Sequence, residues 1–145
     1  IEKFKHTQIG VNSRLDTIQA AVLLRKIPFL KDNNLKRRKI ANFYDKNINN
    51  PKIKKLRYSK NAVYHQYVVL VKNRNKICKI LKKNNIQFGF HYPVSINKLH
   101  VLKKRFKNQK FINAEILANQ CLSLPIDPNL RIDQLKKIVK ILNSF

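Results

Sequence analysis

The run from Tyr67 to Val71 constrains the fold of this chain more than any other segment. It consists of tyrosine, valine and leucine, and its length and β-branched content predict a buried strand. Helical patterns both precede and follow it in the sequence. We therefore expect an α+β domain in which helices flank a small sheet.

Two consecutive helices are predicted before this strand. Ser13 and Asp16 have the spacing of a capping box, so we expect a helix over residues 14–27. Its surface is apolar nearly all round, which predicts that it is buried. Pro28 suits the first turn of a new helix, expected over 28–48. This second helix should bury a set of mostly apolar side chains: Leu30, Ile40, Ala41, Phe43, Tyr44 and Ile48.

The later elements follow a break at residues 49–51 (Asn-Asn-Pro). A short helix capped by Asn73 or Asn75 should end at residues 84–85, which are both asparagine. Residues 86–90 alternate apolar and small or polar side chains, the period of a strand with one buried face.

Two more helices are expected near the end of the chain, over about 113–122 and 131–143. The first carries Ala114, Leu117, Ala118 and Cys121. The second carries an apolar stripe of Ile132, Leu135, Ile138, Val139 and Leu142.

Several kinds of site are excluded by composition. Cys78 and Cys121 form no CxxC motif and are expected to be buried, inert thiols, while the four histidines lack the spacing of metal ligands. Seven scattered carboxylates argue against a paired-carboxylate hydrolase. Gly10 and Gly89 are the only glycines, so neither a P-loop nor a dinucleotide fingerprint is present. The chain alone contains no self-sufficient active site, and no metal site is expected.

The cellular location is predicted from the absence of membrane-spanning and signal-peptide patterns in the sequence. No run approaches the roughly 20 apolar residues of a membrane span, and the N-terminus has no apolar region of a signal peptide. We therefore expect a cytoplasmic protein that does not insert into membranes. The sequence begins with Ile1 and contains no methionine, so we also expect it to be a piece of a longer chain.

The chain carries a net charge of +25, which raises the question of nucleic acid or another polyanion. Eight of the 32 basic residues are arginine and the rest are lysine, scattered from Lys3 to Lys140. Base and phosphate recognition favours the planar fork of arginine, and stacking platforms need interleaved aromatic residues, which this chain lacks. The charge therefore indicates a lysine-rich composition, and no specific nucleic-acid partner is expected.

Two short segments are unusual for a plain scaffold. Residues 10–14 (Gly-Val-Asn-Ser-Arg) place polar side chains before a helix start, where an anion could bind, although capping alone would also explain them. Residues 91–93 (His-Tyr-Pro) end the predicted strand, and a structural histidine followed by a turn proline is the alternative.

Five motifs in sequence order carry a resemblance to one family. Residues 10–21 read Gly-Val-Asn-Ser-Arg-Leu-Asp-Thr-Ile-Gln-Ala-Ala, and residues 37–44 read Arg-Arg-Lys-Ile-Ala-Asn-Phe-Tyr. Residues 64–67, the segment 86–93 ending in His-Tyr-Pro, and Ala-Glu at 114–115 followed by Cys-Leu-Ser-Leu-Pro-Ile at 121–126 continue the series. Together they closely resemble the DegT/DnrJ/StrS family of sugar-nucleotide aminotransferases, over essentially the whole chain.

The resemblance implies an aspartate-aminotransferase-like fold (fold type I) and the cofactor pyridoxal 5′-phosphate. Members move an amino group, usually from L-glutamate, onto a keto group of a nucleotide-linked sugar, as in cell-surface polysaccharide or amino-sugar synthesis. The family's cofactor lysine lies upstream of the segment matching Gly10, so this chain has no catalytic lysine. The resemblance therefore implies that residues 1–48 end the large domain and form connecting helices. Residues 49–145 would form the C-terminal small domain, with a mainly antiparallel sheet.

Four site residues are carried over from the resemblance. The family's active site lies at a homodimer interface, where the asparagine matching Asn12 reaches the cofactor phosphate of the other subunit. The arginine matching Arg14 lies nearby and can pair with a carboxylate of substrate or amino donor. Residues matching His91 and Tyr92 line the sugar-nucleotide pocket. The alternative is a non-catalytic remnant, or a basic domain that binds polyanions.

Overall fold

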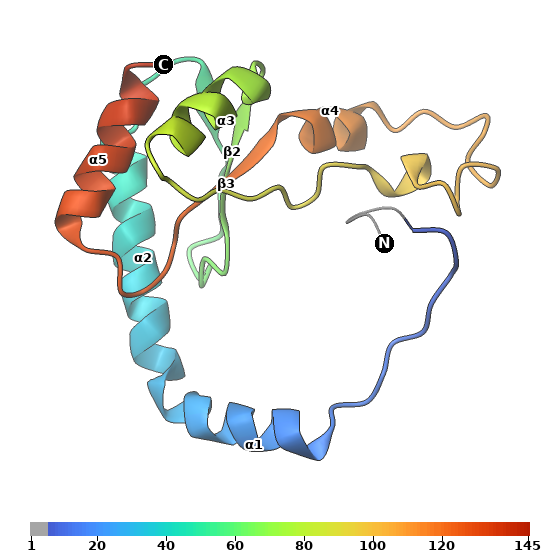
Figure 1. The fold of residues 1–145 in the computed structure, drawn as a ribbon, viewed down its shortest axis with the longest axis horizontal. Helices are drawn as coiled ribbons and strands as arrows, with labels where there is room; N and C mark the ends of the chain where they lie inside the picture. The colour runs from blue at the N-terminus through green and yellow to red at the C-terminus, as the bar shows by residue number, and fades with distance from the viewer. Residues whose placement is uncertain (1–5) are drawn as a thin grey trace.

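A computed structural model describes residues 6–145 and shows helices packed around a small sheet (Figure 1). The expected α+β fold is confirmed. Residues 6–12 are irregular, and residues 1–5 lie outside the described residues. The elements in chain order are α1 (Thr17–Lys26), the 3-10 helix η1 (Ile27–Phe29), α2 (Leu30–Asn47), β1 (Ile53–Lys55), β2 (Tyr67–Val71), α3 (Arg74–Lys83), the 3-10 helix η2 (Ile96–Lys98), α4 (Ile112–Gln120), β3 (Cys121–Leu124) and α5 (Ile132–Asn143).

The sheet has three antiparallel strands in the order β1-β2-β3. The predicted strand Tyr67–Val71 is confirmed as β2, at the centre, where an apolar run can be covered on both sides. Strand β1 was not predicted, because it has three residues and two of them are lysine. The helix predicted over 113–122 ends instead at Gln120, so Cys121 begins β3 and does not lie on a helix face.

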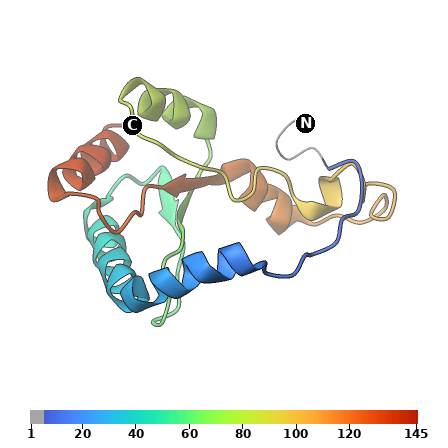
Figure 2. The same ribbon diagram turned by 60° about the horizontal axis from the view of Figure 1, so that its bottom comes forward.

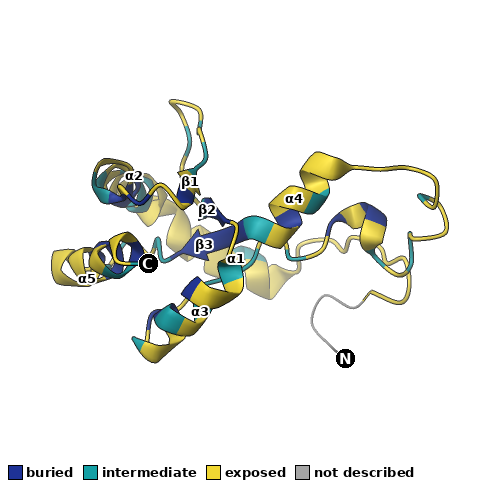
Figure 3. Ribbon diagram, turned by 90° about the horizontal axis from the view of Figure 1, so that it is seen from above, coloured by how far each residue is buried: buried dark blue, intermediate teal, exposed yellow. Residues whose placement is uncertain are grey.

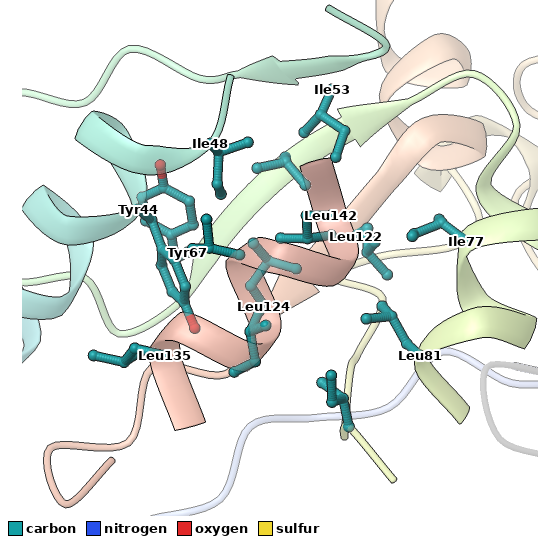
Figure 4. Close-up of a cluster of buried hydrophobic side chains, with 14 of the residues drawn as sticks. Tyr44, Ile48, Ile53, Tyr67, Ile77, Leu81, Leu122, Leu124, Leu135 and Leu142 are labelled. Carbon is teal, nitrogen blue, oxygen red and sulfur yellow. The ribbon is translucent and has the colours of Figure 1, made fainter. Parts of the chain in front are cut away.

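The main hydrophobic core lies on one face of the sheet. Strand alternation turns Val69 and Leu122 to this face, where α2, α3 and α5 cover them (Figure 4). The ring of Tyr44 is fully buried there, and its hydroxyl donates a hydrogen bond to the carbonyl oxygen of Pro125 at 2.8 Å. Burial raises the pKa of Tyr44, so this hydroxyl stays a donor at any physiological pH. Figure 3 shows that burial is concentrated in this half of the molecule, while α4 is largely exposed.

Helices α3 and α5 follow the prediction closely. Asn73 precedes the first turn of α3, and Asn85 adopts a left-handed conformation (φ 56°) just after its end, as an asparagine tolerates. The apolar stripe of α5 is confirmed except at its first residue: Ile132 is exposed. The buried members of the stripe are Leu135, Ile138, Val139 and Leu142.

Helix α1 departs from the prediction. It begins at Thr17, because Asp16 is itself the N-cap and accepts a 2.7 Å hydrogen bond from the backbone N–H of Gln19. The helix extends from the end of α2 that is remote from the sheet (Figures 1 and 2). None of its residues is buried by the described chain, and Leu30 at the start of α2 is exposed as well. The predictions that the first helix and Leu30 are buried are therefore wrong within residues 6–145.

The segment 86–90 is not the regular strand that its alternation predicts. It pairs with β3 through a single antiparallel bridge between Gly89 and Ser123, with N···O distances of 3.1 and 2.9 Å. Phe88 and Phe90 nevertheless pack against the edge of the core, and Ile86 is buried. The apolar side of the predicted strand is thus real, although one bridge replaces a ladder.

Candidate functional site

The second face of the sheet carries a cavity of about 530 Å³. Val68 and Leu70 of β2 reach it because they alternate with the core-facing residues of the strand. Helix α4 and the segment around η2 supply most of the remaining wall, which is largely apolar. His91 and Tyr92 both line this cavity. The structure therefore brings these two predicted residues together outside the main core.

His91 is held at the edge of the sheet by β3. Its Nδ1 lies 2.8 Å from the hydroxyl Oγ of Ser123, a side chain that is only 6% exposed. Ser123 points to this face because its neighbours Leu122 and Leu124 point into the core. The serine was not singled out as a site residue from the sequence, although a polar residue between two leucines in a strand is the signal that could have found it.

Tyr92 is anchored through its backbone, while much of its side chain is open to solvent (65% exposed). Its carbonyl oxygen lies 3.5 Å from Sγ of Cys121, in hydrogen-bond geometry with the thiol as donor. The guanidinium of Arg74 bonds the carbonyl oxygens of Ala118 and Cys121 at 2.7 and 3.2 Å and lies over the ring of Phe90. Buried groups thus fix the backbone beneath Tyr92. The peptide bond between His91 and Tyr92 is cis.

His91 also lines a second, smaller cavity of about 340 Å³, so its ring belongs to the wall of both. The polar groups of this cavity come from three separate segments of the chain: His65, Gln66, Gln87, His91, Ser123 and Asp127. Hydroxyl-rich ligands are bound by side chains of these kinds, which donate and accept hydrogen bonds in fixed directions.

Asn12 and Arg14 lie apart from His91. Both are exposed in the irregular segment before α1, and neither lines the cavity that His91 and Tyr92 share. Since α1 begins at Thr17, Asn12 does not stand at a helix start as expected, and no helix N-terminus assists it. Within residues 6–145 neither side chain makes a hydrogen bond or ion pair, so both donors are open to a ligand.

These donors fit a part of the expected cofactor. An amide N–H and a guanidinium are suitable partners for phosphate or carboxylate oxygens. The covalent bond that pyridoxal phosphate makes requires a lysine, which the family resemblance places upstream of the segment matching Gly10. Asn12 and Arg14 therefore have donors of the kind that the phosphate end of this cofactor accepts.

Other kinds of site find no support in the described structure. No group of three or more His, Cys, Asp or Glu side chains among residues 6–145 could hold a metal ion. Cys121 is buried, as expected, whereas Cys78 is only partly buried; this partial burial raises the pKa of the Cys78 thiol and so disfavours the thiolate. Across the same residues, no helix is both long and apolar enough to cross a bilayer.

Comparison with known proteins agrees with this arrangement. Residues 1–143 match the DegT/DnrJ/EryC1/StrS aminotransferase family. The chain is 34% identical over 146 residues to dTDP-3-amino-3,6-dideoxy-alpha-D-galactopyranose transaminase of Aneurinibacillus thermoaerophilus, covering 99% of the chain and 40% of that protein. It is 32% identical over 144 residues to UDP-2-acetamido-2-deoxy-3-oxo-D-glucuronate aminotransferase of Pseudomonas aeruginosa, covering 98% and 40%.

Solved structures of aminotransferases are also similar to this chain over nearly its whole length. The chain superposes on DesV of S. venezuelae with a TM-score of 0.82 and 28% identity, covering 99% of the chain and 40% of DesV. An aminotransferase from Brucella abortus gives a TM-score of 0.79, also at 28% identity, with 99% and 39% covered. The chain thus spans about 40% of the length of the relatives it matches, consistent with a C-terminal portion of such a protein. It belongs to the DegT/DnrJ/EryC1/StrS aminotransferase family.

Proposed function

We propose that this chain is the C-terminal part of a pyridoxal-phosphate-dependent aminotransferase that moves an amino group from L-glutamate to a keto group of a nucleotide-linked sugar. The observation that carries the proposal is the position of His91 and Tyr92, which share a cavity wall outside the core in a chain of this family. Relatives named for dTDP- and UDP-linked sugars support the substrate class.

In this proposal each site residue has a physical task. Pyridoxal phosphate, when bound, supplies the electron sink that amino transfer needs. Asn12 donates its amide N–H to a phosphate oxygen of the cofactor, and Arg14 pairs with a carboxylate of substrate or amino donor. His91 and Tyr92 hydrogen-bond the sugar and hold it in one orientation, which lowers the entropic part of the barrier.

The proposal extends to assembly and organisation. Asn12 and Arg14 lie apart from His91 in the chain, and a homodimer in which each subunit completes the other's site would bring such residues into one site. We further propose that residues 1–48 belong to the end of a large domain and its connecting helices, and 49–145 to the small domain. The protein would act in the cytoplasm, in the synthesis of amino sugars or cell-surface polysaccharides.

The direct test is an amino-transfer assay of the full-length protein. Purified protein with pyridoxal phosphate and L-glutamate should form more than one equivalent of 2-oxoglutarate per bound cofactor only when a dTDP- or UDP-linked 3-keto sugar is added. The chain alone, assayed in parallel, should give no turnover. Glutamate consumption without any dependence on a keto sugar would contradict the proposed substrate class.

Replacing Asn12 by alanine in the full-length protein should weaken cofactor binding by about 1 kcal/mol, roughly a fivefold higher dissociation constant. The reason is the loss of one hydrogen bond to the phosphate, with no helix N-terminus beside it to compensate. Fluorescence titration with pyridoxal phosphate measures the constant. Asn49→Ala, at an amide remote from the segment before α1, is the control, and an unchanged constant in Asn12→Ala would contradict the assignment.

The alternative of a polyanion-binding domain rests on the net charge of +25. We expect weak binding to DNA or RNA at low salt, because released counterions favour association with any dense positive charge. We expect no preference among nucleic-acid sequences. Proteins that recognise one sequence, by contrast, typically bind it at least about a thousandfold more tightly than they bind other sequences. Competition binding near physiological salt measures this preference. One nucleic acid retained with sub-micromolar affinity while others dissociate would favour the alternative.

A further inference from the structure

The contact between His91 and Ser123 is built by the backbone as well as by side chains. Gly89 and Ser123 exchange both backbone hydrogen bonds of the bridge, at 3.1 and 2.9 Å. This places His91, two residues after Gly89, beside the hydroxyl of Ser123 at 2.8 Å. The serine itself is fixed, because it pairs with Val68 in the middle of the β2–β3 ladder.

The hydrogen-bonding needs of Ser123 decide which nitrogen of His91 carries the proton. Ser123 is 6% exposed, and within the described part of the chain Nδ1 of His91 is the only hydrogen-bond partner of its Oγ. If Nδ1 carried a hydrogen and donated it, the hydroxyl hydrogen would have no acceptor among the described residues, which is unfavourable. The hydroxyl therefore donates to Nδ1, and the neutral ring carries its hydrogen on Nε2.

Gly89 provides the space that the ring needs. A Cβ added at position 89 would lie 2.8 Å from Cε1 and 3.4 Å from Nδ1 of His91. Two unbonded carbon atoms do not approach to 2.8 Å, so any residue other than glycine at position 89 would require the imidazole or the backbone to shift. Gly10 shows the contrast, because a Cβ there would meet no atom within 4 Å.

We propose that Ser123 is a positioning residue for His91, with Gly89 as the residue that admits the ring. Ser123 and Gly89 together hold the ring of His91 in the wall shared by the two cavities. The Nε2–H of His91 is then a fixed hydrogen-bond donor, directed to an oxygen of the sugar-nucleotide substrate. This role rests on the proposed function. It adds two residues to the site, and both act through His91.

The test uses the full-length protein labelled with ¹⁵N-histidine, and its first readout needs no substrate. Long-range ¹⁵N–¹H spectra report which imidazole nitrogen is protonated, and His91→Ala identifies the signals. Wild type should show His91 protonated on Nε2. Ser123→Thr, which keeps the hydroxyl, should preserve this state, whereas Ser123→Val, which has the shape of that threonine but lacks the hydroxyl, should give a mixture of both forms. Gly89→Ala, which moves the ring without removing the hydroxyl, should resemble Ser123→Val.

A double-mutant cycle supplies the second readout, with the UDP- or dTDP-linked 3-keto sugar of the transfer assay. Ser123→Val should lower kcat/KM about tenfold, Ser123→Thr should stay within about threefold of wild type, and Ser123→Val should add nothing in a His91→Ala background. Nδ1 protonation in wild type, or additive losses in the cycle, would overturn the positioning role. An unchanged kcat/KM in His91→Ala would instead contradict the proposed role of His91 in substrate binding, and the NMR readout would still decide its pairing with Ser123.

Discussion

Replacing Leu122 by alanine should destabilise the sheet and its helices by about 3 kcal/mol. Leu122 is fully buried in β3, where it faces the core from the strand that also presents Ser123 to the cavity side. Truncation removes apolar contacts and leaves a space between the sheet and its helices that the central strand cannot readily fill. Hydrogen exchange followed by mass spectrometry on the full-length protein should show β2 amides exchanging about a hundredfold faster.

Ile132→Ala is the matched control for this change. Ile132 is 55% exposed in the first turn of α5, so the same kind of truncation should alter stability by no more than about 0.5 kcal/mol. Equal effects of the two variants on β2 exchange would contradict the position of the core. The comparison also tests the corrected end of the α5 stripe.

Replacing His91 by alanine should lower kcat/KM for the keto sugar by tenfold to a hundredfold, the range for losing one or two directed hydrogen bonds, each worth about 1–1.5 kcal/mol. The melting temperature should fall by only a few degrees, because His91 is exposed and lies outside the main core, so its removal costs mainly the hydrogen bond to Ser123. Tyr92→Phe should produce a smaller loss, since only the hydroxyl is removed. Steady-state kinetics with varied sugar and thermal unfolding measure the two properties separately.

His100→Ala serves as the control for His91→Ala. His100 is also exposed, and it lines neither of the two cavities that contain His91. A large loss of melting temperature with normal kinetics in His91→Ala would assign His91 a purely structural role. Similar kinetic losses in both histidine variants would point to a general effect of surface charge.

How far the sequence predicts the fold depends on whether the information is local. Tyr67–Val71 is confirmed to the residue, because its composition suits a strand and no competing pattern overlaps it. Cys121–Leu124 follows α4 without a turn signal, so the end of the helix and the start of the strand could not be separated. The apolar surface of α1 predicts burial, yet amphipathic patterns report only that a face is apolar and not what covers it.

The site residues also differ in how far the sequence alone could indicate them. His91 lies outside the main core, against which Phe88 and Phe90 pack, and its place in the site was expected from the family resemblance. Residues 10–14 were noted for polar side chains before a predicted helix start, but the roles of Asn12 and Arg14 come from the family resemblance, since an irregular exposed segment has no periodic signal. Ser123 required the register between β2 and β3, a long-range pairing that the sequence of either strand leaves undetermined.

The proposed amino transfer can be tested by following the nitrogen atom from L-glutamate to the sugar. Full-length protein is incubated with pyridoxal phosphate, ¹⁵N-labelled L-glutamate and a UDP- or dTDP-linked 3-keto sugar, and the sugar product is analysed by mass spectrometry. Wild type should form an amino sugar that carries the ¹⁵N label, and His91→Ala should form much less of it. An unlabelled sugar recovered unchanged, from protein that has bound the cofactor, for every such sugar tried would contradict the proposed amino transfer.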